Sequence, residues 1–311
     1  MRLAVFDLGT NVFNLLLAQI SNNKCDIFKV VKVGSHIGKA GFKRGSLTPE
    51  AIDSSVEAFS KMMEHITKLG GVDVIKAFAT SAIRDASNGH LFVQKIRERF
   101  GVEVEVISGE REAELIYKGI RESILLYNEN VLMLDIGGGS NELIIANKDK
   151  IHWKHSFPLG VIRMKEIINP SETITESELE AYISHLDSAL SSFFQEVQKY
   201  KPTLLIGTSG SFDTLRELIF PLDKSTLPVM ELPLEKFTLL YNRLLASNHK
   251  ERLNMAGMSA MRADYMVLGV IFVSHIINKA NIKELYQSSF SLKEGYMAEY
   301  AAEYVAAAQQ I

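Results

Sequence analysis

Runs of apolar residues separated by one polar stretch predict that the chain opens with antiparallel strands. An apolar segment at residues 3–6 is followed by Asp7-Leu8-Gly9-Thr10-Asn11 and then by a second apolar segment at 12–20. Residues 26–33 are rich in β-branched side chains, which favour strands. The pattern therefore predicts a hairpin with a polar tip, extended by a third strand into an antiparallel meander, and not a β-α-β crossover.

Helical periodicity begins after this meander. Thr48 and Pro49 are the residue types of an N-cap and a first helical position, and apolar residues then recur at helical spacing to about Gly70. Further segments predict strands at 72–80 and 103–107, and helices at 89–100 and from 111 to about 127. Because strands that alternate with helices pair in parallel under helical cover, the first domain is expected to be α/β.

The opening plan is repeated near the middle of the chain. At 131–146 an apolar strand ends in Asp135, the chain turns through Gly137-Gly138-Gly139-Ser140, and a second apolar strand follows. The first copy has Asp7 and Gly9 at the corresponding points. This repetition predicts an internal duplication into two α/β domains. We expect a first domain at 1–124, on which a closing segment at 297–311 packs back, and a second domain at 125–296.

The rest of the second half supplies one more turn of small residues. A capping box at Thr175 and Glu178 predicts one long helix that ends near Tyr200. A strand at 204–206 then leads into the turn Gly207-Thr208-Ser209-Gly210-Ser211, and a new helix is expected from Phe212. The pattern also predicts helices at 235–245, 263–277 and 292–308 and a strand at 282–286.

Composition and charge exclude several classes of protein. The chain has 311 residues with 34 basic and 37 acidic side chains, so its net charge of −3 gives little general attraction to nucleic acid or to an anionic membrane. One cysteine, Cys25, allows no internal disulfide and indicates no structural zinc site. Since no apolar run reaches about 18 residues and an acid stands at position 7, we expect a cytoplasmic protein without a signal peptide or membrane span.

The three turns of small residues are the candidate chemical site. Consecutive glycines lose much backbone entropy on folding, and a plain hairpin does not require them. Their N–H groups can form a concave anion site, to which Ser140 adds a hydroxyl, so three such turns favour phosphate binding over tight turns beside structural aspartates. We expect Asp7 and Asp135 to face each other across a cleft and hold Mg²⁺, with capping of the adjacent turn as the alternative for each.

Five segments, in order, resemble the exopolyphosphatase / guanosine pentaphosphate phosphatase family over nearly the whole chain. They are Asp7 to Asn11, 79–86, 107–113, 135–143 and 207–211. The resemblance implies two duplicated ribonuclease-H-like domains around a central cleft, the superfold of actin-like ATPases, sugar kinases and heat-shock chaperones. Long members have a further helical module, whereas this chain ends at Ile311, so we expect the short, two-domain form.

The same resemblance implies roles for individual residues. Glu112 matches the glutamate that activates the attacking water as general base, Arg84 matches an arginine that contacts phosphate, and Glu142 matches a glutamate of the cleft that positions metal or water. Without the resemblance, Glu112 is an ordinary first-turn acid and Arg84 a loop arginine beside Asp85. Asp135 completes the implied catalytic set. The implied phosphate-binding residues are Asn11, Arg84, Gly137, Gly138, Gly139, Ser140, Gly207, Ser209, Gly210 and Ser211.

Three positions depart from the family pattern without removing these residues. Val12 follows Asn11 where serine is common, Arg111 precedes Glu112 where acids or amides are frequent, and Lys293 stands in a motif that usually has arginine.

The implied activity is a hydrolase that uses water and Mg²⁺ to remove the terminal phosphate of inorganic polyphosphate or guanosine pentaphosphate. A kinase of the same superfold and a non-enzymatic sensor of these anions are the alternatives. A basic cluster before the first helix fits either contact with a polyanion or a solvated face, and the oligomeric state, a homodimer included, stays open. The cluster comprises Lys29, Lys32, His36, Lys39, Lys43 and Arg44.

Overall fold

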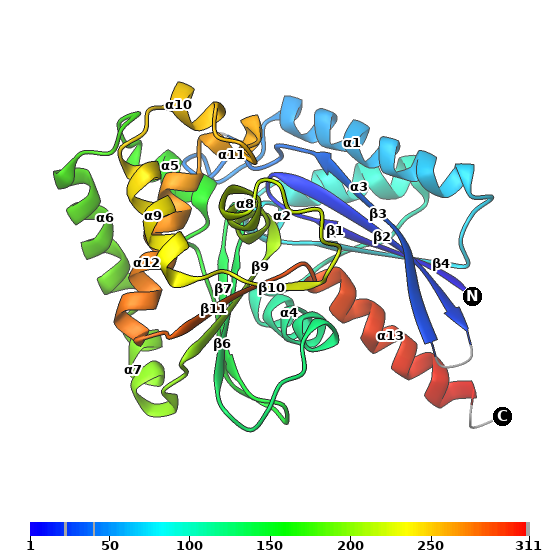
Figure 1. The fold of residues 1–311 in the computed structure, drawn as a ribbon. Coiled ribbons are helices and arrows are strands. Elements are labelled where there is room, and N and C mark those ends of the chain that lie inside the picture. The colour runs from blue at the N-terminus through cyan, green and yellow to red at the C-terminus, as the bar shows by residue number, and fades with distance from the viewer. Residues whose placement is uncertain (22–23, 40, 309–311) are drawn as a thin grey trace. The chain divides into compact units, whose positions relative to one another are not determined.

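The computed structural model describes residues 1–21, 24–39 and 41–308, and the chain divides into two compact units. Unit 1 comprises Met1–Glu122 and Ser291–Ile311, and unit 2 comprises Ser123–Phe290. The sequence places these divisions at 124 and 296, and its closing segment at 297–311 includes residues 309–311, which lie outside the described part of the chain. Each unit is described by itself below (Figure 1).

Unit 1 contains a mixed sheet of five strands in the order β3-β2-β1-β4-β5. The first three strands form the expected antiparallel meander, and β4 and β5 add to it in parallel with β1, which confirms the α/β prediction. Figure 1 shows the meander in blue. The strands are β1 Arg2–Leu8, β2 Val12–Ser21, β3 Lys24–Gly34, β4 Val74–Ala79 and β5 Val104–Val106.

Helices cover both faces of this sheet. One face packs against α1 and α3, and its core includes the stacked rings of Phe6 and Phe59 at 4.5 Å. Phe78 faces the other side of β4 and contacts Tyr296 of α13 at 4.7 Å, so α13 covers the opposite face. The helices of unit 1 are α1 Pro49–Lys68, α2 Ser81–Asp85, α3 Gly89–Phe100, α4 Gly109–Ser123 and α13 Leu292–Ala308.

Unit 2 repeats the same plan with one added strand. Its sheet order is β10-β11-β9-β6-β7-β8, where β6, β7 and β8 form an antiparallel meander and β9 and β11 run parallel to β6. Without β10 this is the arrangement of unit 1, so the predicted duplication of a ribonuclease-H-like domain is confirmed. The strands are β6 Val131–Ile136, β7 Asn141–Ala146, β8 Ile151–Phe157, β9 Leu204–Thr208, β10 Val229–Glu231 and β11 Glu284–Ser288.

In unit 2, α12 is buried along most of its length and contacts α5, α6, α7, α9 and α11. None of the helices in the described ranges is long and apolar enough to cross a membrane. The helices are α5 Val161–Ile168, α6 Glu176–Ala189, α7 Ser191–Tyr200, α8 Ser209–Ile219, α9 Leu234–Leu245, α10 His249–Leu253, α11 Ala260–Ala263 and α12 Met266–Ala280.

Two predictions for unit 2 were wrong. The single helix expected from 175 to 200 is interrupted at Leu190, which is fully buried and has φ −98° and ψ 11°, so tertiary packing overrides the local helical pattern. The expected turn at 207–211 is a direct junction between a strand and a helix, because β9 continues to Thr208 and α8 begins at Ser209. Gly207 is thus a strand residue, and the ring of Phe212 packs where a Cβ atom would lie.

Candidate active site

In unit 1, an acid at the end of β1 and an amide at the start of β2 lie opposite each other. Asp7 lies opposite Asn14 in the β1–β2 register, and the Asn14 Nδ2 group donates to Asp7 Oδ2 at 2.9 Å. Thr10 and Asn11 follow and are both buried. At Gly9 a Cβ atom would lie 2.9 Å from the carbonyl oxygen of Val12, so the tight turn requires glycine.

The same unit brings Arg84 and Glu112 together across 28 residues of sequence. Arg84 lies at the end of the short helix α2, and its Nη1 atom donates to Glu112 Oε2 at 2.9 Å and to the carbonyl of Ile107 at 3.1 Å. Its Nε atom also lies 3.4 Å from Asp85 Oδ1, which is the pairing expected of an ordinary loop arginine. Since Glu112 is only 8% exposed, the guanidinium offsets the charge of a nearly buried carboxylate.

Glu112 lies in the first turn of α4, and the start of this helix determines its position. The hydroxyl of Ser108 accepts from the Arg111 N–H at 3.2 Å, and the Glu112 N–H donates to the Ser108 carbonyl at 2.9 Å, so Ser108 caps the helix. Arg111 and Lys118 both bind Glu299 of α13, and the hydrogen bond to Glu299 raises the pKa of Arg111. Arg111, which departs from the family pattern, therefore connects α4 to α13 through an ion pair with Glu299.

In unit 2, the glycine turn after β6 packs on the N-terminus of α5. All three glycine carbonyls accept hydrogen bonds from residues 160–163: Gly137 from Val161 N at 3.0 Å, Gly138 from Ile162 N at 2.9 Å and Arg163 N at 3.0 Å, and Gly139 from Arg163 Nε at 2.7 Å and Gly160 N at 3.3 Å. A Cβ atom on Gly160 would lie 2.4 Å from backbone atoms of Gly138 and Gly139. Helix α5 was not predicted from the sequence, yet the N-terminus of α5 holds the glycine turn in place through these hydrogen bonds.

The direction of these carbonyls orients the N–H groups of the turn. In a trans peptide the carbonyl and the next N–H point in opposite directions, and none of the described peptide bonds is cis. The N–H groups of Gly138, Gly139 and Ser140 consequently face away from α5 on a common side. Successive N–H groups in this arrangement can form a concave site for an anion, and phosphate binding by this turn stays a prediction.

Two carboxylates lie side by side next to this turn. Asp135 and Glu142 are cross-strand neighbours on β6 and β7, and both are buried. Ser209 donates to Asp135 Oδ2 at 2.5 Å, and Ser156 donates to Glu142 Oε1 at 2.6 Å. Like charges that face each other across a sheet repel, so this pair requires donors or a cation nearby.

The junction between β9 and α8 completes this half of the site. Ser209 has φ +66°, and Ser211 donates its hydroxyl to the carbonyl of Ile136 at 3.1 Å. Each serine hydroxyl has a single proton, so both serines use it to hold β6, and only their backbone N–H groups can donate to an anion. A Cβ atom on Gly210 would lie 1.8 Å from Arg262 Nη2, which places this guanidinium against the first turn of α8. Burial lowers the pKa of Arg262, while Asp213 and Asp135 act in the opposite direction.

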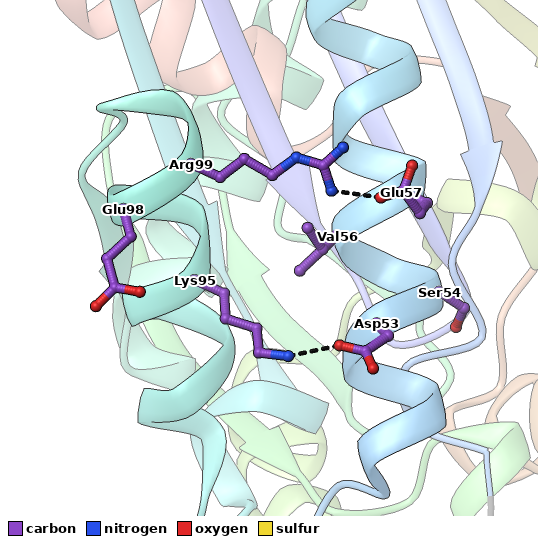
Figure 2. Close-up of a pocket in the computed structure, with 7 residues that line it drawn as sticks. All are labelled: Asp53, Ser54, Val56, Glu57, Lys95, Glu98 and Arg99. Carbon is purple, nitrogen blue, oxygen red and sulfur yellow. Dashed lines mark hydrogen bonds and ion pairs between the residues drawn. The ribbon is translucent and has the colours of Figure 1, made fainter.

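A surface pocket elsewhere in unit 1 contains none of the predicted site residues. It lies between α1 and α3, and Figure 2 shows Lys95 directed towards Asp53 and Arg99 directed towards Glu57. Both pairs are ion pairs between the two helices. Because the cations of this pocket already have acidic partners, it is a poor candidate for binding an anion.

A family model matches residues 16–303 of the chain, and its description is the Ppx/GppA phosphatase family. The chain belongs to the Ppx/GppA phosphatase family. A crystal structure of an exopolyphosphatase from Cytophaga hutchinsonii is 33% identical and superposes with a TM-score of 0.94, over 97% of this chain and 98% of that one.

Named Ppx/GppA relatives include both kinds of phosphatase. Exopolyphosphatase 1 of Mycobacterium tuberculosis is 28% identical, and the match covers 95% of this chain and 87% of that protein. A guanosine-5'-triphosphate,3'-diphosphate pyrophosphatase of Aliivibrio fischeri is 25% identical over 94% of this chain. The chain spans 58% of the length of that pyrophosphatase.

The candidate site has acidic residues suited to a magnesium ion, although no cluster of three or more His, Cys, Asp or Glu side chains in the described ranges forms a metal site by itself. Mg²⁺ keeps several waters and commonly binds one or two carboxylates together with substrate phosphates. Asp135, beside Glu142, fits such a ligand set. Asp7 belongs to the other unit, so its pairing with Asp135 across a cleft stays a prediction.

Three residues of the candidate site were missed from the sequence. Arg262 is 52 residues from Gly210, and no local pattern connects them. The sequence did contain an indication of Asn14, because Asn14 follows Asp7 by seven residues as Glu142 follows Asp135. Nothing in the sequence indicates Gly160, because its role depends on contact with another segment.

The basic cluster before α1 is exposed at all six positions. Its contact with a polyanion stays a prediction.

Proposed function

We propose that this chain is an Mg²⁺-dependent phosphoanhydride hydrolase that removes the terminal phosphate of inorganic polyphosphate or guanosine pentaphosphate, with Glu112 as general base. The observation that supports it most is the pair formed by Arg84 and Glu112, at 2.9 Å, on the first turn of α4. The Ppx/GppA relatives named for these substrates support the choice of substrate class.

In the proposed reaction, Glu112 accepts a proton from water. The water oxygen forms a bond to the terminal phosphorus, the anhydride P–O bond breaks, and the bridging oxygen leaves with its electron pair on the shortened chain. A carboxylate and an anionic substrate repel each other, and Arg84 offsets this repulsion while its forked donors can also bind a phosphate oxygen. Positioning and charge neutralisation of this kind account for most catalysis of phosphoryl transfer.

Backbone groups of unit 2 bind the phosphates in this proposal. The N–H groups of Gly138, Gly139 and Ser140 point to one side, and the first N–H groups of α8 lack partners within the helix. Arg262 adds a cation against Gly210. Such preorganised donors stabilise charge that develops in the transition state without further rearrangement.

Magnesium, held by Asp135 and Asp7, would supply additional neutralisation of phosphate charge. Glu142 adjoins Asp135 and is suited to orient a metal-bound or attacking water. Ser209 and Ser156 keep the two carboxylates of unit 2 in place through their hydroxyl groups.

The test is phosphate release measured in parallel from polyphosphate, guanosine pentaphosphate and ATP, with Mg²⁺ and with EDTA. We expect release from polyphosphate or guanosine pentaphosphate that EDTA abolishes. A matched pair of variants, Glu112→Gln and Glu110→Gln, separates the proposed base from an exposed acid two residues earlier in the same helix. Transfer of phosphate from ATP to a hydroxyl acceptor indicates a kinase, and binding without any release indicates a sensor; either result contradicts the proposal.

A further inference from the structure

The segment that follows β3 is hydrogen-bonded to the turn that follows β1. The N–H groups of Ser35 and His36 both donate to the carbonyl of Asn11, at 2.9 and 3.1 Å. The N–H group of Gly38 donates to the carbonyl of Thr10 at 3.0 Å. These bonds hold the backbone of the turn and leave the side chain of Asn11 to be oriented by something else.

The Asn11 side chain has one satisfied end and one unsatisfied end. Its Oδ1 atom lies 3.0 Å from Nδ1 of His36. Asn11 is only 7% exposed, and its Nδ2 atom is buried without a hydrogen-bond partner among the described residues. A buried amide that lacks a partner is destabilising unless a ligand or water satisfies it. Because the bonds to Nδ2 and Oδ1 diverge from the same trigonal carbon, an Oδ1 atom directed at His36 leaves Nδ2 directed elsewhere.

His36 adopts a backbone conformation that favours glycine. Its φ is +53°, and residues with a Cβ atom are destabilised in this region. The His36 side chain is exposed, so burial of the ring does not offset this strain. Strained residues of this kind are concentrated at sites of function, where a required contact maintains them. Among the described residues, the ring of His36 is hydrogen-bonded to Asn11.

We propose that His36 is a positioning residue that holds the Asn11 amide with its NH₂ group turned to donate to a phosphate oxygen of the substrate. The inference rests on the proposed function, since the ligand is the phosphate group of that same substrate. A carbonyl oxygen can only accept, so His36 must have a proton on Nδ1. In neutral His36 this means the Nδ1–H tautomer, with Nε2 unprotonated.

Three substitutions at position 36 separate orientation of the amide from maintenance of the loop. His36→Asn places an amide on the same Cγ atom that bears Nδ1 in histidine, and asparagine tolerates positive φ. His36→Asp has the same shape but presents an acceptor. His36→Gly removes the donor and relieves the backbone strain.

The readouts are the Kd of tripolyphosphate, the KM and kcat for phosphate release, and the melting temperature. We expect His36→Asp and His36→Gly to raise Kd and KM by about tenfold, the effect of one hydrogen bond to a charged group, and to leave kcat within about twofold. His36→Asn should stay within about twofold of the wild type. His36→Gly should melt close to the wild type, because relief of the backbone strain opposes the loss of the hydrogen bond to Asn11. In an Asn11→Ala background, His36→Gly should cause no further loss of binding.

Nitrogen chemical shifts of His36 provide a readout that needs no substrate. The Nδ1–H tautomer is expected in the ligand-free protein, and the Nε2–H tautomer overturns the proposal. Equal losses in His36→Asn and His36→Gly, or wild-type affinity in His36→Asp, overturn it as well. If the wild-type protein neither binds tripolyphosphate nor releases phosphate, the proposed function fails together with this inference. If the wild-type protein binds tripolyphosphate but the variants at position 36 do not show the expected changes in Kd and KM, this inference alone is refuted.

Discussion

Replacement of Gly160 by alanine should loosen the glycine turn of unit 2. Gly160 has φ −60° and ψ 148°, which alanine adopts freely, so any effect of the substitution is steric. The new Cβ atom would lie 2.4 Å from the backbone of Gly138 and Gly139, and backbone cannot swing aside as a flexible side chain does. Overpacking of a filled interior costs about 1–3 kcal/mol.

For a unit of this size, about 2 kcal/mol corresponds to a melting temperature about 4–8 °C lower. The displaced α5 should also release the carbonyls of the turn, so that its N–H groups lose their common orientation and the KM for polyphosphate rises. Urea unfolding and steady-state kinetics measure the two effects.

Gly269→Ala is the matched control. Gly269 lies within α12, and a Cβ atom there would contact Val161 at an ordinary 3.7 Å. Alanine in a helix interior should stabilise the protein by about 0.5–1 kcal/mol. If Gly160→Ala is as stable and as active as the wild type, or changes stability as Gly269→Ala does, then the close approach of Gly160 does not hold the turn.

Three further substitutions test other parts of the site. Arg84→Lys keeps the charge but replaces the planar guanidinium, whose Nη1 atom donates to both Ile107 and Glu112, with a single ammonium group. Because an ammonium group cannot make a two-nitrogen contact with phosphate, activity should fall at least about tenfold with unchanged melting, and full activity argues against such a contact. Asp135→Asn should weaken Mg²⁺ activation more than folding, and an unchanged Mg²⁺ titration with lower melting temperature supports a structural aspartate. Lys39→Glu should impair hydrolysis of long polyphosphate more than of tripolyphosphate, unlike Lys148→Glu, and equal effects exclude the basic cluster from substrate binding.

The local plan of the fold could be predicted from sequence because it depends on local patterns. Apolar runs and glycine turns located the first meander and the β6–β7 hairpin of the second, and the shared aspartates at positions 7 and 135 revealed the duplication. The break at Leu190 could not be predicted, since the helical pattern continues through it and only packing interrupts the helix.

The candidate site was predictable where neighbouring residues define it. Glu112 and Arg84 belong to motifs, and the structure places them in contact. Arg262 and Gly160 depend on contacts between segments far apart in the chain, and no spacing in the sequence indicates such contacts. Asn14 could have been found by aligning the two halves of the sequence, because Asn14 follows Asp7 at the same distance as Glu142 follows Asp135.

The central claim is that Glu112 accepts the proton of the attacking water, and Glu112→Gln tests it most directly. Glutamine has nearly the same volume, and its carbonyl still accepts from Arg84, so the fold and the binding of substrate should persist. The measurement is kcat for phosphate release, together with the Kd of tripolyphosphate for the same protein. Loss of a general base predicts a kcat lower by about 10²-fold or more at nearly unchanged Kd. A kcat within about threefold of the wild type would contradict the account and remove Glu112 from the mechanism.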